Sequence, residues 1–149
     1  MWLQKKFNLP VLTIVLFSTL LSCQPTQTID QVESTFPNGD RKSVISYTVK
    51  GDDTIPNSEM VFHKDGSLSM KGNLDADGKR HGAWKAYFPD STLWSEGSYL
   101  HGKNDGKRTV WYENGQKRYE GSYKDGKEVG LWKFWDRQGK LEKEVNYDK

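Results

Sequence analysis

The sequence has little of several features that common classes of protein need. Its 149 residues include one cysteine, a count that excludes both a disulfide framework and a cysteine-rich zinc site. Alanine is scarce, with three residues against 14 glycines, and this balance argues against a helical protein. Surplus charge is scarce as well, because 22 basic and 20 acidic side chains leave a net charge of +2. A nucleic-acid binder meets each phosphate with a cation, so we do not expect a nucleic-acid partner.

A long apolar run is present near the amino terminus. Lys5 and Lys6 precede an uncharged stretch over residues 7–22, which is shorter than the roughly 20 apolar residues that span a bilayer. This layout is typical of a signal peptide. The stretch ends in Leu-Leu-Ser-Cys at residues 20–23, which resembles the bacterial lipobox, and the resemblance implies cleavage before Cys23 and diacylation of its thiol. The alternative is an uncleaved anchor with an incidental thiol, which the short run disfavours.

These motifs divide the chain into three parts. We expect residues 1–22 to be a lipoprotein signal peptide, residues 23–34 a polar tether behind the lipid, and residues 35–149 a repeat domain. Cleavage takes two of the 22 basic side chains and none of the 20 acidic ones, which leaves equal numbers of each. The mature chain is then neutral overall and is held to a membrane by acyl chains on Cys23. The expected location is the bacterial cell envelope, at the outer membrane.

Glycines, aromatic residues and glutamates recur in the second half of the chain at a step of 24 residues. Five columns keep this step: Gly78, Gly102 and Gly126; Gly82, Gly106 and Gly130; Tyr87, Trp111 and Trp135; Glu96, Glu120 and Glu144; Tyr99, Tyr123 and Tyr147. Towards the amino terminus the step loosens to 25 and then 27 residues. We count five units, the first two degenerate, and such a period is typical of a repeat array in which each unit packs on its neighbours.

Within a unit the pattern is that of a β-hairpin. Residues 107–112 and 116–123 are rich in β-forming residues and are joined by Asn114 and Gly115, a strong hairpin signal. No stretch keeps a helical period. We therefore predict an all-β fold, an elongated single-layer antiparallel array of repeated hairpins. At about 4.8 Å per strand, each repeat lengthens the sheet by roughly 9.6 Å, and five hairpins give roughly 45 Å.

A family resemblance follows from these units. Residues 119–132, YEGSYKDGKEVGLW, resemble the MORN (membrane occupation and recognition nexus) repeat, whose pattern is Y-E-G-x-aromatic-x-x-G-x-x-x-G-x-aromatic. Residues 95–108 match it except that Ser95 and Arg108 replace the first tyrosine and the last aromatic residue. The step of 24 is most similar to a bacterial MORN-like variant, some members of which carry an antitoxin family name. Over residues 36–147 the resemblance implies a hairpin array used as an interaction scaffold, with no catalytic residues.

The hairpin signal also predicts a register. Centring the turn on Asn114 and Gly115 pairs residues whose numbers sum to 229. A turn that starts one residue earlier, with Tyr112 opposite Gln116, is the alternative. The predicted pairs are Thr109 with Glu120, Trp111 with Arg118, Lys85 with Glu96, Tyr87 with Trp94, and Lys133 with Glu144.

The register separates the side chains into two faces. One face carries the charge pairs around a ladder of Tyr87, Trp111 and Trp135, whose rings either build the core or bind a partner. On the other face, which we expect to pack, Gly97 and Gly121 leave room for neighbouring rings. The residues expected there are Trp84, Ala86, Phe88, Leu93, Gly97, Tyr99, Val110, Tyr112, Tyr119, Tyr123, Trp132, Phe134, Leu141 and Tyr147.

Trp94 is the main candidate binding residue. Its equivalents in the next two units are Arg118 and Glu142, so no packing requirement shared by the repeats explains a tryptophan there. Exposed aromatic residues tend to mark interaction sites. The alternative is cross-strand packing of Trp94 on Tyr87.

Residues for catalysis or metal binding are scarce. Glu96, Glu120 and Glu144 lie about 9.6 Å apart in the predicted sheet, near the upper separation of an inverting glycosidase pair, but their recurrence favours a structural role. Residues 73–78 mimic the start of a calcium loop, but Trp84 stands where the closing glutamate belongs, so we interpret them as an acidic loop. The histidines, His63, His81 and His101, lie in three phases of the repeat. We therefore expect no enzyme activity, metal or cofactor.

The favoured functional hypothesis is a membrane-tethered, noncatalytic scaffold that binds another envelope protein along a sheet face or edge. A carbohydrate-binding module is the alternative, in which the aromatic ladder stacks on sugar rings. A weaker third hypothesis, an antitoxin or immunity protein, rests on family naming.

Overall fold

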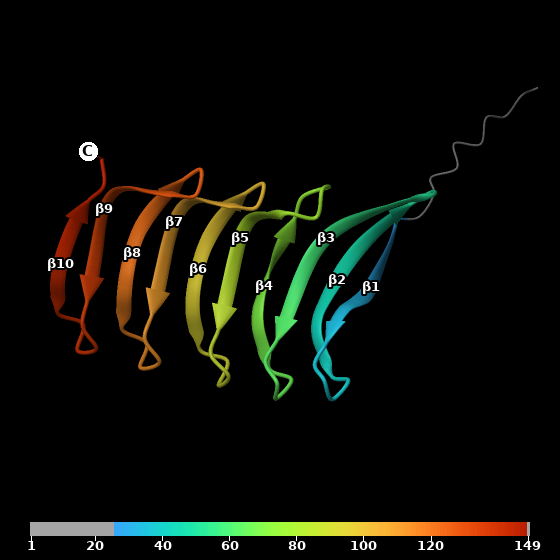
Figure 1. Ribbon diagram of the computed structural model, residues 1–149, viewed down its shortest axis with the longest axis horizontal. Coiled ribbons are helices and arrows are strands. Elements are labelled where there is room, and N and C mark those ends of the chain that lie inside the picture. Colours follow the sequence, from blue (N-terminus) through green and yellow to red (C-terminus); the bar gives the residue numbers. More distant parts are fainter. Residues whose placement is uncertain (1–25, 149) are drawn as a thin grey trace, which may run out of the picture.

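The computed structural model describes residues 26–148, which form one open antiparallel sheet whose strands follow one another in chain order (Figure 1). The ten strands are β1 (Gln27–Thr35), β2 (Arg41–Lys50), β3 (Asp53–Phe62), β4 (Leu68–Leu74), β5 (Arg80–Tyr87), β6 (Leu93–Leu100), β7 (Lys103–Trp111), β8 (Lys117–Lys124), β9 (Lys127–Trp135) and β10 (Leu141–Asn146). The prediction of an all-β, single-layer hairpin array is confirmed. The expected signal peptide and the lipidation of Cys23 lie outside the described residues.

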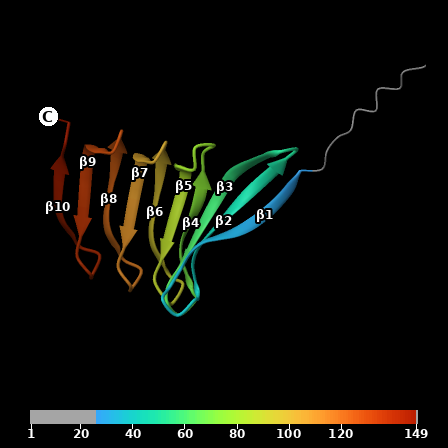
Figure 2. The same ribbon diagram turned by 45° about the vertical axis from the view of Figure 1, so that its right-hand side comes forward.

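The sheet is twisted along its length. Figure 2 shows β1 and β2 strongly tilted against β9 and β10, as expected when each strand rotates slightly relative to the one before it. The described residues hold no apolar helix of the length needed to cross a bilayer.

The expected tether is wrong over most of its length, because residues 27–34 belong to β1. This segment pairs with β2, for example Ile29 with Tyr47 and Val32 with Val44. Almost all of its side chains are exposed, which is why its composition resembles a linker. A polar segment forms a strand here because the edge of β2 offers backbone donors and acceptors that β1 satisfies without burying its own side chains.

Five hairpins close at the same end of the strands, each with a three-residue loop. In the β7–β8 turn, the N–H of Tyr112 donates to the carbonyl of Gln116 and the N–H of Gly115 donates to the carbonyl of Tyr112, both at 2.9 Å. Gly115 has a φ of 80°, which glycine adopts without strain. The corresponding loops run from Phe36 to Asp40, His63 to Ser67, Phe88 to Thr92 and Asp136 to Lys140. The turn that starts one residue earlier, the alternative from the sequence, is therefore the one that forms.

The predicted register is correct in the strand bodies and wrong beside the turns. Thr109 pairs with Glu120, Lys85 with Glu96, and Lys133 with Glu144, as predicted. Trp111, however, pairs with Lys117 rather than Arg118, and Tyr87 pairs with Leu93 rather than Trp94. A β-bulge inserts one residue after each three-residue turn and so restores the register in the strand body.

A second glycine column has its own structural reason. Gly82, Gly106 and Gly130 have positive φ angles of 68°, 98° and 67°. Each lies where the pairing of its strand with the preceding strand shifts, in the β4–β5, β6–β7 and β8–β9 pairs. An irregularity with positive φ favours glycine, which explains why these positions recur.

Side chains on the expected packing face form the core. Trp84, Ala86, Val110 and Trp132 are buried there. The rings of Trp84 and Trp132 lie over Gly72 and Gly121, so closely that a Cβ on either glycine would fall 2.3 Å and 2.1 Å from ring carbons. Gly121 therefore makes room for a ring as predicted.

The prediction that Gly97 makes room for an aromatic ring is wrong. The neighbour of Gly97 is the stem of Arg108, whose Cγ would lie 3.4 Å from an added Cβ. Leu93 and Leu141 also depart from their predicted face, because they pair with Tyr87 and Trp135 across the last register position. The bulge is again the cause, since it changes the alternation of faces at these residues.

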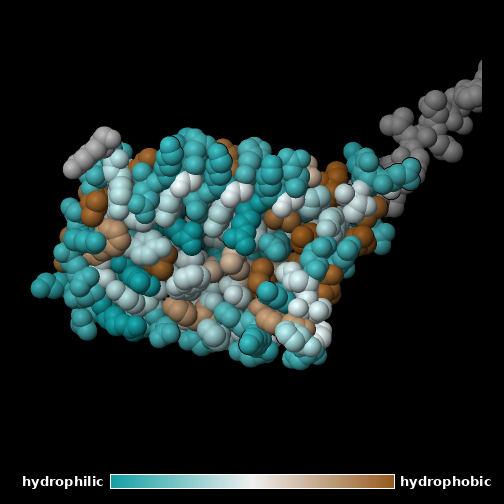
Figure 3. Space-filling model, viewed as in Figure 1, coloured by the Kyte–Doolittle hydropathy of each residue, from teal (hydrophilic) through white to brown (hydrophobic). Residues whose placement is uncertain are grey.

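The opposite face carries a charged row. Lys85, Glu96, Thr109, Glu120, Lys133 and Glu144 are consecutive partners across β5 to β10. The face turned to the viewer in Figure 3 is mostly hydrophilic, with apolar residues in small groups.

Candidate functional site

Trp94 occupies the bulge of the β5–β6 hairpin. Its neighbours Leu93 and Ser95 pair with Tyr87 and Ala86, which leaves Trp94 as the extra residue. The same bulge position holds Ser69 in the preceding unit, and Arg118 and Glu142 in the two units that follow. The position is therefore occupied by polar residues in these other units, as the sequence comparison indicated.

The side chain of Trp94 borders a hollow in the packing face. It is 40% exposed, and its ring lies 6.4 Å from the ring of Phe88 at an angle of 55°. The predicted neighbour on β5, Tyr87, pairs instead with Leu93. Trp94 lines a hollow of about 160 Å³ together with Met70, Arg80, Trp84, Tyr99 and Arg108.

Two arginines give this hollow a cationic wall. The guanidinium of Arg80 lies 4.3 Å from the centre of the Trp84 ring and 5.7 Å from that of Tyr99, within the range of a cation–π contact. Arg108 donates from Nη1 to Asn104 Oδ1 at 3.1 Å and to the Tyr99 hydroxyl at 3.4 Å. The Nε of Arg108 is buried and has no hydrogen-bond acceptor among the described residues. A hollow lined by aromatic rings and guanidinium groups suits an acidic segment with apolar neighbours.

The aromatic ladder lies in different surroundings from Trp94. Tyr87, Trp111 and Trp135 are each half-buried. Trp111 borders a separate hollow of about 480 Å³ with Leu93 and the β7–β8 turn. The ammonium of Lys117 lies 5.4 Å from the centre of the Trp135 ring. The structure therefore does not bring the four candidate binding residues into one site.

Glu120 is held as a carboxylate by two lysines. Its Oε2 accepts from Lys117 Nζ at 2.8 Å and lies 3.3 Å from Lys107 Nζ. The hydrogen bond from Lys117, and then that from Lys107, lower the pKa of Glu120 despite partial burial. Glu144 forms a similar ion pair with Lys133 at 2.9 Å. The carboxyl group of Glu120, kept ionised in this way, is poorly suited to act as a general acid.

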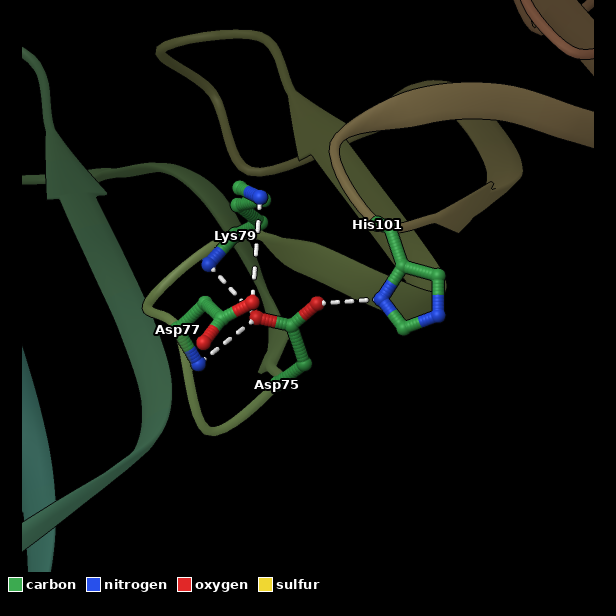
Figure 4. A network of polar contacts seen from close by, with 4 residues as sticks. All are labelled: Asp75, Asp77, Lys79 and His101. Atoms are coloured by element: carbon green, nitrogen blue, oxygen red, sulfur yellow. Dashed lines mark hydrogen bonds and ion pairs between the residues drawn. The ribbon is translucent and has the colours of Figure 1, made fainter.

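The structure brings together three side chains that the sequence did not connect. Asp75 opens the β4–β5 turn, His81 lies at the start of β5, and His101 lies in the β6–β7 turn. Figure 4 shows the carboxylate of Asp75 between its own turn and the ring of His101. The two imidazole rings lie 5.5 Å apart. The sequence, in which the histidines lie in different phases of the repeat, did not indicate that His81 and His101 lie side by side.

Asp75 is the centre of this group. His101 Nδ1 lies 2.7 Å from Asp75 Oδ2, and this hydrogen bond is the main cause of the lowered pKa of Asp75. Asp75 Oδ1 accepts from the backbone N–H groups of Lys79 and Asp77 at 2.9 and 3.1 Å. The N–H of Gly102 donates to the carbonyl of Arg80, which folds the β6–β7 turn over the start of β5 and brings His101 close. The sequence offered no signal for this contact beyond the two histidines themselves.

The fold and the repeated turns define the class of this protein as an open array of β-hairpin repeats. The family model of the MORN repeat variant matches residues 80–101, 104–125 and 128–149. These three matches are consistent with a MORN-repeat-like protein, and the matched repeats contain the hairpins β5–β6, β7–β8 and β9–β10. Repeats of this family suggest a role in protein interaction or membrane binding and are generally noncatalytic.

Comparisons with whole proteins add little. No curated protein sequence matches the chain. Among solved structures, the chain is similar to a chain of the "GtfA/B complex bound to UDP and GlcNAc", with 14% sequence identity and a TM-score of 0.34. The match covers 81% of the present chain and 24% of that chain, so the present protein corresponds to a small part of its length.

Proposed function

We propose that this chain is a membrane-tethered, noncatalytic interaction scaffold that binds another protein of the cell envelope through the hollow beside Trp94. The observation that carries the proposal is a 40% exposed tryptophan at a bulge position where other units have serine, arginine or glutamate. Tryptophan and arginine are the residues most enriched at the energetic centres of protein interfaces. Arg80 and Arg108 supply the cations that an acidic partner segment would meet.

The membrane tether is the second part of this proposal. It is supported by the signal-peptide layout of residues 1–22 and by the lipobox-like residues that end in Cys23. Two acyl chains on Cys23 would hold the protein to the bacterial outer membrane. Because β1 begins at Gln27, the hairpin array then starts within a few residues of the lipid.

Crosslinking in intact cells tests the scaffold. The full chain is expressed with a photo-crosslinking residue in place of Ser69, at the corresponding bulge of the preceding hairpin. We expect a specific protein adduct that Trp94→Ser abolishes, because this change removes the tryptophan proposed to contact the partner. Serine is the natural residue at the bulge of the preceding hairpin, so the backbone should tolerate it. Leu131→Ser is the matched control, since Leu131 is also an exposed apolar side chain, and it should leave the adduct intact. Equal yields from both variants would exclude the hollow as the binding site.

Membrane fractionation tests the tether. Cys23→Ala should move the protein from the membrane to the soluble fraction, because the acylated thiol is lost. Unchanged membrane fractionation would contradict the lipid anchor.

A carbohydrate-binding role is the second candidate, favoured by the hollow that Trp111 borders with polar turn residues. Sugar rings stack on aromatic faces of this kind, and Asn114 would offer hydrogen bonds. A glycan array separates the two functions: retention of a defined glycan that Trp111→Ala abolishes supports sugar binding, and a blank array favours the scaffold.

A further inference from the structure

We propose that Asp75, His81 and His101 form a binding site for a divalent transition-metal ion of the zinc type. Each side chain offers one ligand atom, and these three atoms lie within 4.8 Å of one another. Two imidazoles and a carboxylate are donors that suit Zn²⁺, Ni²⁺ and Cu²⁺, whereas Ca²⁺ and Mg²⁺ prefer oxygen ligands. The site is independent of the hollow beside Trp94 and of any protein partner.

The carboxylate of Asp75 is already oriented as a metal ligand would be. Its Oδ1 is held by the backbone N–H groups of Lys79 and Asp77, at 2.9 and 3.1 Å. Its Oδ2 faces His101 at 2.7 Å (Figure 4). Hydrogen bonds to the outer oxygen of a ligating carboxylate are a usual feature of metal sites, because they fix the direction of the inner oxygen.

His81 supplies the observation that points most directly to a ligand. Its Nδ1 is buried and has no hydrogen-bond partner among the described residues. Buried polar atoms in folded proteins are rarely left without a partner, so this nitrogen calls for an explanation. A metal ion held between His81 and Asp75 would accept the lone pair of that nitrogen.

Side-chain movements are needed to admit the ion, because the three ligand atoms lie within 4.8 Å of one another and are not all at the spacing that a metal requires. Ligand atoms around tetrahedral Zn²⁺ lie about 3.4 Å apart when each is about 2.1 Å from the metal. The contact between Asp75 and His101 is shorter than this, at 2.7 Å, so the two side chains must separate slightly. The side chain of His101 is 65% exposed and is free to turn. The ion would replace the hydrogen between the two side chains, with His101 carrying its hydrogen on the outward Nε2.

The following repeat shows what a unit without this site looks like. Twenty-four residues after His81 and His101 stand Asp105 and Asp125. Asp105 is occupied there by Lys124 Nζ at 3.0 Å and by the backbone N–H of Asp125 at 3.3 Å. The ammonium of Lys124 thus pairs with the carboxylate in that unit, whereas in the unit with the two histidines Nδ1 of His81 has no hydrogen-bond partner within residues 26–148.

Titration of the full chain with ZnCl₂ in detergent micelles tests the site. All proteins are untagged and carry Cys23→Ala, which removes the sole thiol of the sequence. We expect one Zn²⁺ per chain, with Ca²⁺ unable to compete. His81→Gln and Asp75→Asn should each weaken Zn²⁺ binding at least roughly tenfold, because each removes a ligand. His63→Gln is the matched control: this histidine lies elsewhere, with Nε2 3.0 Å from the carbonyl oxygen of Tyr87, and its loss should leave Zn²⁺ binding unchanged.

The absorption spectrum of bound Co²⁺ gives a readout that does not depend on any variant folding. The intense bands of four-coordinate Co²⁺ in the protein with all three histidines support the site, whereas the weak spectrum of the hydrated ion overturns it. Equal weakening by His63→Gln and His81→Gln, or preference for Ca²⁺ over Zn²⁺, would also overturn it.

Discussion

The two ends of the sheet share a backbone plan but differ in how their side chains pack. The amino-terminal hairpins, β1–β2 and β3–β4, close with the same three-residue loop as β5–β6, β7–β8 and β9–β10. A bulge follows that loop at both ends of the sheet. In the carboxy-terminal part, however, tryptophan rings lie over glycines, as Trp132 lies over Gly121. In the amino-terminal part the row that contains Trp84 continues through Glu59 and Ile45 instead.

This difference separates two sources of the repeat pattern. The turn and its bulge require one residue with positive φ, and even Ser91 adopts this conformation. The turns therefore persist where the sequence period is loose. Ring-over-glycine packing needs a particular pair of residues on adjacent strands and is limited to part of the array. The family match, which begins at residue 80, covers the part that contains Trp132 and Gly121.

The largest expected effect comes from removing a tryptophan of the carboxy-terminal core. Trp132 is buried and contacts the rings of Tyr119, Tyr123, Phe134 and Tyr147. Trp132→Ala should lower the free energy of unfolding by about 3–5 kcal/mol, because it leaves a large cavity. Urea unfolding followed by far-ultraviolet circular dichroism measures the loss.

Val44→Ala is the amino-terminal counterpart. Val44 is equally buried, but it lies in the row that continues through Met60 and Lys71 to Lys85, on the face opposite Trp132. The loss there should be about 2 kcal/mol, because two buried methyl groups are removed. Hydrogen exchange should show that Trp132→Ala opens β8 to β10 before β1 to β4, since repeats are stabilised mainly by their neighbours. Equal opening of both ends would mean that the sheet unfolds as one unit and that the comparison has no energetic basis.

The next effect tests the glycines beneath the rings. Gly121→Ala would place a Cβ 2.1 Å from the Trp132 ring, so the ring must move. The expected cost is about 1–3 kcal/mol, typical of an overpacked core. Gly97→Ala is the control, because its Cβ would meet only the flexible stem of Arg108 at 3.4 Å. Thermal unfolding of both variants should separate them, and equal losses would show that these glycines are needed for the backbone rather than for the ring.

How much of this was predictable depends on how local each feature is. The pairs Lys85–Glu96 and Lys133–Glu144 follow from the repeat and the hairpin signal, and both are correct. The partner of Trp111 was not, because Asn-Gly is compatible with both a two-residue and a three-residue loop, and the bulge that follows restores the same register further on. The register of the strand bodies could therefore be predicted from the sequence, whereas the predicted position of the turn was wrong by one residue.

The cluster of Asp75, His81 and His101 shows a different limit. These residues come from two turns and a strand, and His101 lies 26 residues from Asp75. The β4–β5 turn has a three-residue loop, whereas β6–β7 and β8–β9 close with two residues of positive φ. An alignment on the period of 24 hides this difference, so the repeat itself gave no reason to bring the three side chains together.

A smaller effect concerns the charged row. Glu120→Gln should lower the free energy of unfolding at pH 7 by up to about 1 kcal/mol, because the lysine partners are largely exposed to solvent. The pKa of Glu120 is lowered in the folded protein, so its contribution is complete above the pKa of the unfolded chain and is lost as the pH falls through the folded-state value. The difference between wild type and variant should therefore shrink as the pH falls below the usual pKa of glutamate and vanish once the pH is below the folded-state pKa of Glu120, as urea unfolding at a series of pH values will show.

Glu144→Gln is the matched control for the charged row. Glu144 lies on the edge strand β10, is more exposed than Glu120 and has one lysine partner, at 2.9 Å. Its substitution should cost less than that of Glu120 at pH 7. A larger cost for Glu144→Gln would contradict this expectation. It would mean that the number of lysine partners does not determine how much a glutamate of this row contributes to stability.

The smallest effect is expected at the bulge, the feature that both parts of the sheet share. Trp94→Arg installs the residue that Arg118 supplies in the next unit, and Trp94→Ser installs that of Ser69 in the preceding one. Both should change the free energy of unfolding by no more than about 0.5 kcal/mol, because Trp94 is exposed and the bulge backbone tolerates all three residues. Thermal unfolding measures this directly. A loss above about 2 kcal/mol would show that Trp94 stabilises the sheet through its contact with Phe88, so that its exposure would no longer argue for a binding role.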